Sequence, residues 1–144
     1  MQRPTRILVP VDLSPRSQLA VDYGAMLAEA TGATLVLHTN VNLPERALLE
    51  ERYRKQDGSV EEAADLALSD IAASLADSIT VEHRATFRDF PADSILELTA
   101  ADGIDMIVIG SHGRSGMTRW MLGSVAEKVS RHAEVPVVIV PARS

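Results

Sequence analysis

The 144-residue sequence contains no cysteine. This absence excludes a disulfide framework and thiolate metal sites, and it fits a reducing compartment, so we expect a cytoplasmic protein. The first ten residues hold no long apolar run before a small-residue cleavage site, and no secretory signal peptide is expected. Apolar runs such as residues 7–9 and 106–109 are far shorter than the roughly 20 residues of a membrane-spanning helix. We therefore expect no membrane partner.

The sequence also lacks a net positive charge, because it has 14 Lys and Arg but 20 Asp and Glu, which gives a formal charge of −6. Broad binding to nucleic acid depends on neutralising several phosphates with Lys and Arg, so no nucleic-acid partner is expected. Four basic residues nevertheless fall close together: Arg114, Arg119, Lys128 and Arg131. They either receive one small anion or form a solvated helix face.

Five apolar segments predict β-strands. Four are continuously apolar, which is typical of strands covered on both faces of a parallel sheet: 6–11, 34–38, 105–109 and 136–140. In residues 79–85 the apolar positions alternate, which predicts a half-exposed strand at an edge. Helical patterns separate the strands and indicate right-handed βαβ connections.

Four helices are predicted between these strands. The first begins near Ser14-Pro15 and ends at Gly32, with an apolar face of Leu19, Tyr23, Met26, Leu27 and Ala30. The second begins at the capping box 59–62 and ends near Asp77, the third covers 91–101, and the fourth follows Ser124. The charged stretch 40–58 is interpreted as a mobile, partly helical excursion.

Together these elements predict one α/β domain over residues 1–144. Its expected architecture is Rossmann-like: an open, doubly wound, five-stranded parallel sheet of order 3-2-1-4-5 with four helices. Ligands of such folds bind outside the carboxyl ends of the strands, where the winding reverses. The last strand, 136–140, would then lie at an edge, where unpaired backbone groups favour a two-fold homodimer.

A glycine-rich segment joins the strand at 105–109 to the last helix, and it holds four of the eight glycines: Gly110, Gly113, Gly116 and Gly123. Glycine permits positive φ angles, so several N–H groups can turn towards one anion beside the helix N-terminus. Polyphosphate is the expected ligand, with donors from Ser124 and Arg114. Alternatively, Ser124 to Glu127 is only a capping box. The segment matches neither the P-loop nor Gly-x-Gly-x-x-Gly.

With these residues the sequence resembles the universal stress protein family, in its ATP-binding branch. The motif Gly-x2-Gly-x9-Gly-Ser is met by Gly110, Gly113, Gly123 and Ser124. The resemblance extends to Pro-x-Asp at 10–12, to His38, and to the closing strand 136–140, through which it implies the same dimer. It also implies a role in stress response with nucleotide as the signal.

The resemblance implies an ATP site in two parts. Its adenine and ribose end consists of Pro10, Val11 and Asp12, and its phosphate and ribose side of Gly110, Gly113, Arg114, Gly123, Ser124 and Val125. Thr39 stands where an apolar residue usually packs on adenine, and Asp89 stands where the family often has glycine. Both departures from the family pattern are expected to affect the affinity for ATP.

Other polar residues leave alternatives open. Asp12 accepts hydrogen bonds from an adenine amino group or a ribose hydroxyl, or it serves only as a cap or turn for the helix near Pro15. His112 contacts phosphate or metal, or it is a solvated loop residue. His38, His83 and His132 show no metal-ligand spacing, so a Mg²⁺ ion would arrive with the nucleotide, held by phosphate oxygens and water.

No residue is a convincing general base, and one or two arginines supply little charge for phosphoryl transfer. The sequence therefore favours a nucleotide-binding sensor or regulator, whose protein partner it does not identify, over an enzyme. Two alternatives are a slow ATP hydrolase and a nucleotide-free interaction module in which the glycine segment is only a turn.

Overall fold

The computed structural model describes residues 2–52, 58–112 and 122–141. Five strands form one parallel sheet in the order β3-β2-β1-β4-β5. They are β1 (Arg6–Pro10), β2 (Thr34–Asn40), β3 (Val81–Thr86), β4 (Met106–Gly110) and β5 (Val137–Val140). The predicted strand order and the edge position of the alternating strand β3 are confirmed.

The described residues contain five helices, so the expectation of four is wrong. They are α1 (Ser17–Thr31), α2 (Leu43–Arg52), α3 (Val60–Ala73), α4 (Pro91–Ala101) and α5 (Ser124–His132). The additional helix is α2, which lies in the charged stretch after β2. It buries only Leu49 and Glu45, so its sequence carries too weak an apolar pattern to distinguish a helix from a polar connection.

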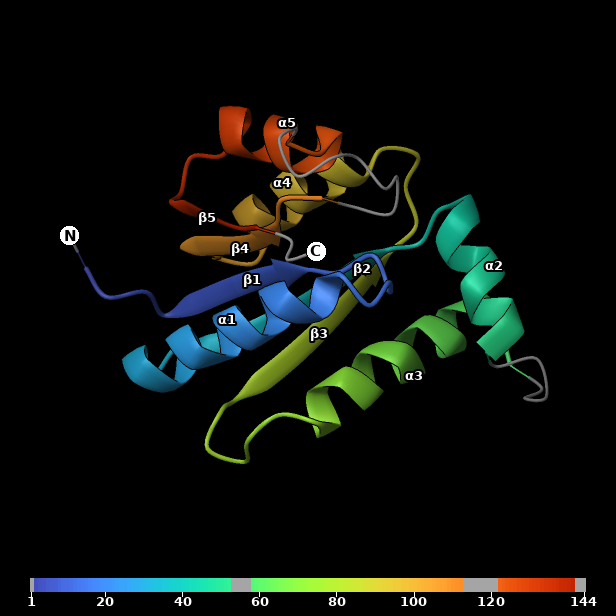
Figure 1. Cartoon of the computed structure of the whole chain (residues 1–144), viewed down its shortest axis with the longest axis horizontal. Helices are drawn as coiled ribbons and strands as arrows, with labels where there is room; N and C mark the ends of the chain where they lie inside the picture. Colours follow the sequence, from blue (N-terminus) through green and yellow to red (C-terminus); the bar gives the residue numbers. More distant parts are fainter. Residues whose placement is uncertain (1, 53–57, 113–121, 142–144) are drawn as a thin grey trace.

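The helices cover the sheet on both faces and give three layers (Figure 1). Alternate strand residues supply the two cores. Ile7, Val9, Leu35 and Leu37 pack in the core beneath α1 and α3, whereas Leu8, Val36, Ile107 and Ile109 pack in the core beneath α4 and α5. No helix in the described ranges has the length and apolar character needed to cross a membrane.

Helix α1 packs on the sheet through small residues: Ala20, Val21, Gly24, Ala25 and Ala28. A Cβ atom on Gly24 would lie 2.5 Å from Val9 Cγ2, so the helix approaches too closely for large side chains. The predicted apolar face is therefore wrong for Leu19, Tyr23 and Met26, which are 36%, 41% and 51% exposed. Leu27, from the same predicted face, does pack against the core. The predicted end of α1 is confirmed, since Gly32 has φ 79° and its N–H donates to Ala28 O.

The other helix boundaries follow local chemistry. Ser59 caps α3 as predicted, accepting a hydrogen bond from Glu62 N at 3.2 Å, although this helix ends at Ala73 and not near Asp77. Helix α4 has its predicted bounds, with proline in its first turn. Helix α1 begins at Ser17, three residues later than Ser14. The Ser14 hydroxyl donates to Asp12 Oδ1, and Ser17 N donates to Ser14 O at 3.1 Å, so residues 14–17 form a turn before the helix.

Candidate functional site

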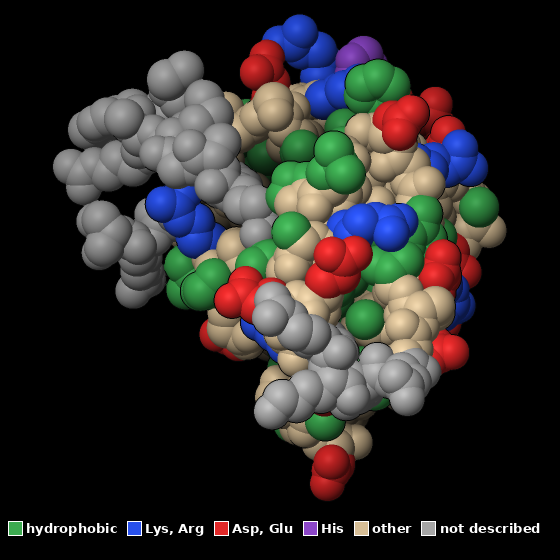
Figure 2. Space-filling model, turned by 90° about the vertical axis from the view of Figure 1, so that its right-hand side faces the viewer, with side chains coloured by type: hydrophobic (Ala, Val, Ile, Leu, Met, Phe, Trp, Pro, Cys, Tyr) green, Lys and Arg blue, Asp and Glu red, His purple; other side chains and the backbone are tan. Residues whose placement is uncertain are grey.

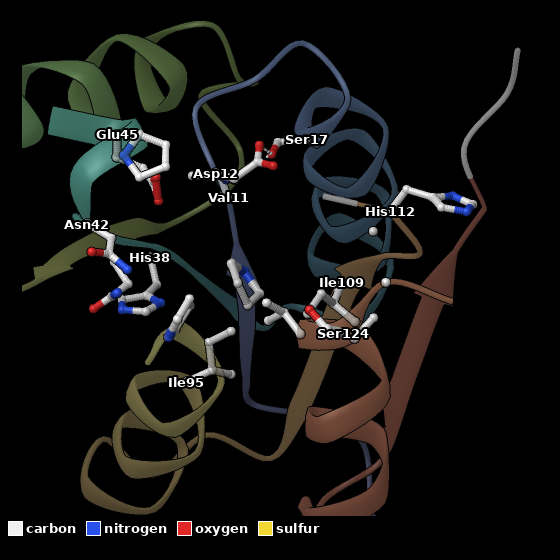
Figure 3. A pocket seen from close by; sticks show the side chains of 18 residues that line it. Val11, Asp12, Ser17, His38, Asn42, Glu45, Ile95, Ile109, His112 and Ser124 are labelled. Atoms are coloured by element: carbon white, nitrogen blue, oxygen red, sulfur yellow. Dashed lines mark hydrogen bonds between the residues drawn. The ribbon is translucent and has the colours of Figure 1, made fainter. Parts of the chain in front are cut away.

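A cavity of about 290 Å³ opens beside the carboxyl ends of β1, β2 and β4 (Figure 3). Eight of the eleven predicted site residues line it: Pro10, Val11, Asp12, Gly110, His112, Gly123, Ser124 and Val125. Gly113 and Arg114 lie outside the described residues. The position agrees with the general rule for doubly wound sheets, because β1 and β4 flank the point where the winding reverses.

Thr39 is the one described predicted residue that does not line the cavity. Successive strand residues point to opposite faces of a sheet, and Thr39 is on the same face as Leu37, towards the α1 and α3 core. It is fully buried, and its Oγ1 has no hydrogen-bond partner among the described residues. Its neighbours His38 and Asn40 line the cavity instead.

One end of the cavity is formed by the start of α5. Gly123 is the N-cap, with φ −61° and ψ 151°, and its N–H donates to Ser111 O at 2.7 Å. Ser124 is the exposed first helical residue, so the interpretation of Ser124 as the side-chain cap is wrong. The N–H groups of Ser124, Val125 and Ala126 belong to the first turn, where an α-helix offers them no internal acceptor. All three residues line the cavity, and such a helix end favours an anion.

Asp12 occupies the middle of the site, at the end of β1. Its Oδ1 accepts hydrogen bonds from Ser14 N, Ser14 Oγ and Ser17 Oγ, the last at 2.7 Å. The next residue, Leu13, has φ 64°, a strained conformation for a residue with a side chain. Leu13 is nevertheless buried in the core beneath α1. Asp12 therefore has the turn-forming role and also lines the cavity.

The opposite end of the cavity contains a hydrogen-bond network centred on Asn40. Asn40 Oδ1 accepts from Thr86 Oγ1 at 2.8 Å, from Arg88 N at 3.1 Å and from Ser94 Oγ at 2.8 Å. Since the Thr86 hydroxyl donates its proton to Asn40, its oxygen accepts from His38 Nε2 at 2.8 Å. The proton of the neutral His38 ring is therefore on Nε2. Burial lowers the pKa of His38 to about 4, so the ring is uncharged at neutral pH.

Two residues that sequence reasoning missed complete this end: Asn42, directly before α2, and Glu45 within it. Asn42 Nδ2 donates to Asp89 O at 3.1 Å, and Asn42 Oδ1 accepts from Leu43 N at 2.9 Å. The start of α2 is thereby joined to the loop before α4. Asp89 itself is exposed and does not line the cavity. Glu45 is only 8% exposed, and it points from α2 into the cavity (Figure 3).

The suspected basic cluster is only partly within the described residues. Lys128 Nζ lies 2.8 Å from Asp93 Oδ1, and Arg131 lies 2.7 Å from Glu127 Oε1. Both pairs are exposed, and Figure 2 shows acidic and basic side chains interspersed on the molecular surface. These two residues therefore fit the solvated helix face. Arg114 and Arg119 are outside the described ranges.

His112 does not fit the picture of a solvated loop residue. It is 8% exposed, lines the cavity, and its Nδ1 lies 3.0 Å from Ser111 Oγ. Within the described ranges, no group of three or more His, Asp or Glu side chains is arranged to hold a metal ion. The protein residues alone thus define an anion-accepting helix end, a carboxylate in the middle, and a polar end near β2 and α2.

The fold places the chain among doubly wound α/β proteins, with a cavity at the topological switch point. Residues 4–141 match the model of the universal stress protein family, and the chain belongs to this family. It is 30% identical over 145 residues to universal stress protein A homolog 1 of Coxiella burnetii, covering 93% of this chain and 94% of the relative. It is 31% identical over 144 residues to YxiE of Bacillus subtilis, covering 94% and 97%.

Other relatives are longer. A universal stress protein of Mycolicibacterium smegmatis is 31% identical over 140 residues, and the match covers 95% of this chain but 46% of that protein. Among solved structures, MJ0577 of Methanocaldococcus jannaschii has the same fold, with a TM-score of 0.80, 24% identity and 99% coverage of both chains. A universal stress protein solved in complex with cAMP has a TM-score of 0.67 and 28% identity, covering 99% of this chain and 100% of that one.

Proposed function

We propose that this universal stress protein binds an adenine nucleotide in the cavity, and that occupancy by nucleotide acts as a signal in stress response. The observation that carries the proposal is that the first turn of α5 and Asp12 line one cavity at the switch point of the sheet. The relative in complex with cAMP supports it. An Archaeoglobus fulgidus universal stress protein in complex with dAMP adds a second nucleotide complex in the family.

The order of strands β2, β1 and β4 suggests how a nucleotide would lie. The phosphate would contact the first turn of α5 beside Gly110, at the end of β4. The ribose would lie opposite Asp12, at the end of β1. The base would then face His38 and Glu45, at the end of β2 and the start of α2.

ATP with Mg²⁺ is the proposed full ligand, with Gly113 and Arg114 as further phosphate contacts. The nucleotide itself would bring the metal ion, because phosphate oxygens and water are the ligands that Mg²⁺ prefers. At the phosphate and ribose parts of the cavity the carboxylate is that of Asp12, whose Oδ1 already accepts hydrogen bonds from Ser14 and Ser17. We therefore favour a binding protein over an ATP hydrolase.

A homodimer through β5 is a second part of the proposal. This strand lies at the edge of the sheet next to β4, and all four of its residues are partly exposed. A two-fold contact between two copies would pair the outer backbone groups of β5 and cover its apolar side chains.

The replacement Ser124→Pro tests the phosphate position. Proline suits the first position of a helix, and Gly123 already has the extended backbone that a residue before proline adopts. The change removes one N–H and one hydroxyl while the fold is kept. Because a hydrogen bond to a charged group contributes about 1.5–3 kcal/mol, AMP affinity should fall roughly tenfold or more.

Isothermal titration with AMP and with adenosine separates the phosphate contribution from the rest. Adenosine affinity should be unchanged in Ser124→Pro, and the matched variant Ser124→Ala reports the loss of the hydroxyl alone. Equal AMP affinity in wild type and Ser124→Pro would place the phosphate elsewhere. Absence of AMP, ADP and ATP binding to the wild-type protein would support the nucleotide-free interaction module.

A further inference from the structure

Helix α1 carries a second apolar row, on the side that faces away from the sheet. Leu19, Tyr23 and Met26 repeat at i, i+4 and i+7, so they lie together on one side of the helix. The helix packs on the sheet through small residues on its opposite side, and all three of these large side chains are exposed. We call these three residues the outer stripe. Single exposed apolar residues are common, whereas contiguous apolar surface is typical of an interaction site.

One flank of the outer stripe is acidic. Asp22 lies about one helical turn from Leu19 and from Met26, and Glu29 lies about one turn after Met26. Both carboxylates are exposed, and they accept hydrogen bonds from neutral side chains, an amide at 2.8 Å and a hydroxyl at 3.0 Å. These contacts leave the two negative charges uncompensated.

The charge around the outer stripe has the same sign. Helix α1 contains two acidic residues and α3, on the same side of the sheet (Figure 1), contains four, whereas neither helix contains Lys or Arg. One of the four, Asp65, lies 3.2 Å from His83 Nδ1. Two arginines, Arg16 and Arg52, lie near the start of α1. The rest of this side of the molecule therefore presents a negative surface around an apolar row.

The sign of this charge decides between two kinds of partner. A second copy of the chain would bring a formal charge of −6 and the same acidic helix against the stripe, and like charges that face each other disfavour binding. A protein segment with an apolar row flanked by Lys and Arg would instead complement both features. The spacing i, i+4, i+7 is the one by which two helices contact each other through apolar residues.

We infer that the outer face of α1 is a docking surface for a basic amphipathic helix of another protein. The apolar residues of that helix cover the outer stripe, and its Lys or Arg side chains lie beside Asp22 and Glu29. The composition of the stripe fits this role, because Tyr and Met are enriched in interface cores. The inference goes beyond nucleotide binding, because none of these α1 residues lines the proposed nucleotide cavity.

The probe for this surface is a fluorescently labelled peptide of Leu and Lys, about 18 residues or five helical turns long, in an amphipathic helical pattern. A scrambled peptide of the same composition has the same charge without the apolar row. Fluorescence anisotropy should show saturable one-to-one binding of the amphipathic peptide to the wild-type protein and severalfold weaker binding of the scrambled peptide. Absence of binding would overturn the inference. Equal binding of the two peptides would also overturn it, because charge alone would then explain the interaction.

The double variant Leu19→Gln/Met26→Gln removes apolar contacts while it keeps residues that favour a helix. Both positions are exposed, so the fold should be kept, which circular dichroism checks. Affinity for the amphipathic peptide should fall about tenfold. The matched control is Leu43→Gln, at an exposed leucine of α2, and it should keep the wild-type affinity. An unchanged affinity in the double variant would contradict docking on α1.

Two further measurements separate the charge and the partner. Asp22→Lys should weaken binding of the amphipathic peptide severalfold and reduce its dependence on salt, whereas Glu50→Lys, at an exposed position of α2, should have little effect. Equal affinities of the two charge variants would contradict the acidic flank. Sedimentation velocity should give the double variant the same oligomeric state as the wild type. A change to a smaller species would show that a second copy covers the outer stripe, and it would overturn the inference.

Discussion

Lowering the pH from 7 to 5 should destabilise the protein through His38. Burial lowers the pKa of His38 from 6.5 to about 4, so the unfolded chain binds a proton in this range that the folded protein does not. Stability contributed by the neutral ring is therefore complete above pH 6.5 and is lost as the pH falls towards 4. For these two pKa values the loss between pH 7 and pH 5 is about 2 kcal/mol.

The variant His38→Gln isolates this contribution. The glutamine amide can replace the Nε2–H donor to Thr86 but does not titrate. Urea unfolding at pH 7, 6 and 5, at constant ionic strength, gives the free energy of unfolding of both proteins. The wild-type value should fall by about 2 kcal/mol more than that of the variant. The other three histidines are common to both proteins, so to first order their contributions cancel in the difference.

Below pH 5, the loss of stability has a different origin. The hydrogen bond from Arg6 lowers the pKa of Glu82 below its ordinary value of 4.5, so its stabilising contribution is lost only as the pH falls below that value. The comparison between pH 7 and 5 therefore reports His38. Identical pH dependence of wild type and His38→Gln would refute the assignment of a buried, neutral ring.

Two further predictions concern packing and assembly. Gly24→Ala should destabilise the protein by about 1–3 kcal/mol through overpacking against Val9, in spite of a gain of about 1 kcal/mol in helix propensity. Chemical denaturation of this variant measures the net effect, and the exposed control Ala30→Gly measures the helix propensity alone. An increase in the stability of Gly24→Ala would show that α1 can move away from the sheet. Sedimentation velocity at micromolar concentration should detect a dimer; a wild-type monomer would contradict the role of β5.

The sheet could be predicted from the sequence because its signal is local and strong. Continuous apolar runs identify β1, β2, β4 and β5 as strands, and alternation marks β3 as an edge strand. Of the four continuous runs, β5 is the one that lies at an edge with its residues partly exposed. The capping box at Ser59 and the glycine at position 32 define helix ends through interactions within a few residues. Such features need no knowledge of tertiary contacts.

The buried face of α1 could not be predicted in the same way, and for the charged stretch that contains α2 the sequence predicted only partial helix without bounds. Large apolar side chains suggested a face at Leu19 and Tyr23, but the close approach of α1 at Gly24 admits only small ones. That spacing is a property of the packed layers and not of the helix sequence. Helix α2 buries few residues, and its role became visible only through the cavity that Glu45 and Asn42 line.

The glycine segment was predicted from the sequence because it directly follows a strand, whereas Asp12 was placed at the site by the resemblance, with which its position after the first strand agrees. Thr39 was placed at the site by resemblance, whereas strand alternation directs His38 and Asn40 there. The alternation of side chains along β2 would have predicted these two residues if Leu37 had first been assigned to the core beneath α1 and α3. The choice between the two faces depends on which helices cover them, and that is a tertiary property.

The most direct test of the central claim is a ¹⁵N–¹H correlation spectrum of the protein titrated with AMP. If the phosphate binds the first turn of α5, the amide resonances of Ser124, Val125 and Ala126 should shift strongly and saturably, and adenosine should move them much less. Unchanged resonances for these three amides at saturating AMP would contradict the account.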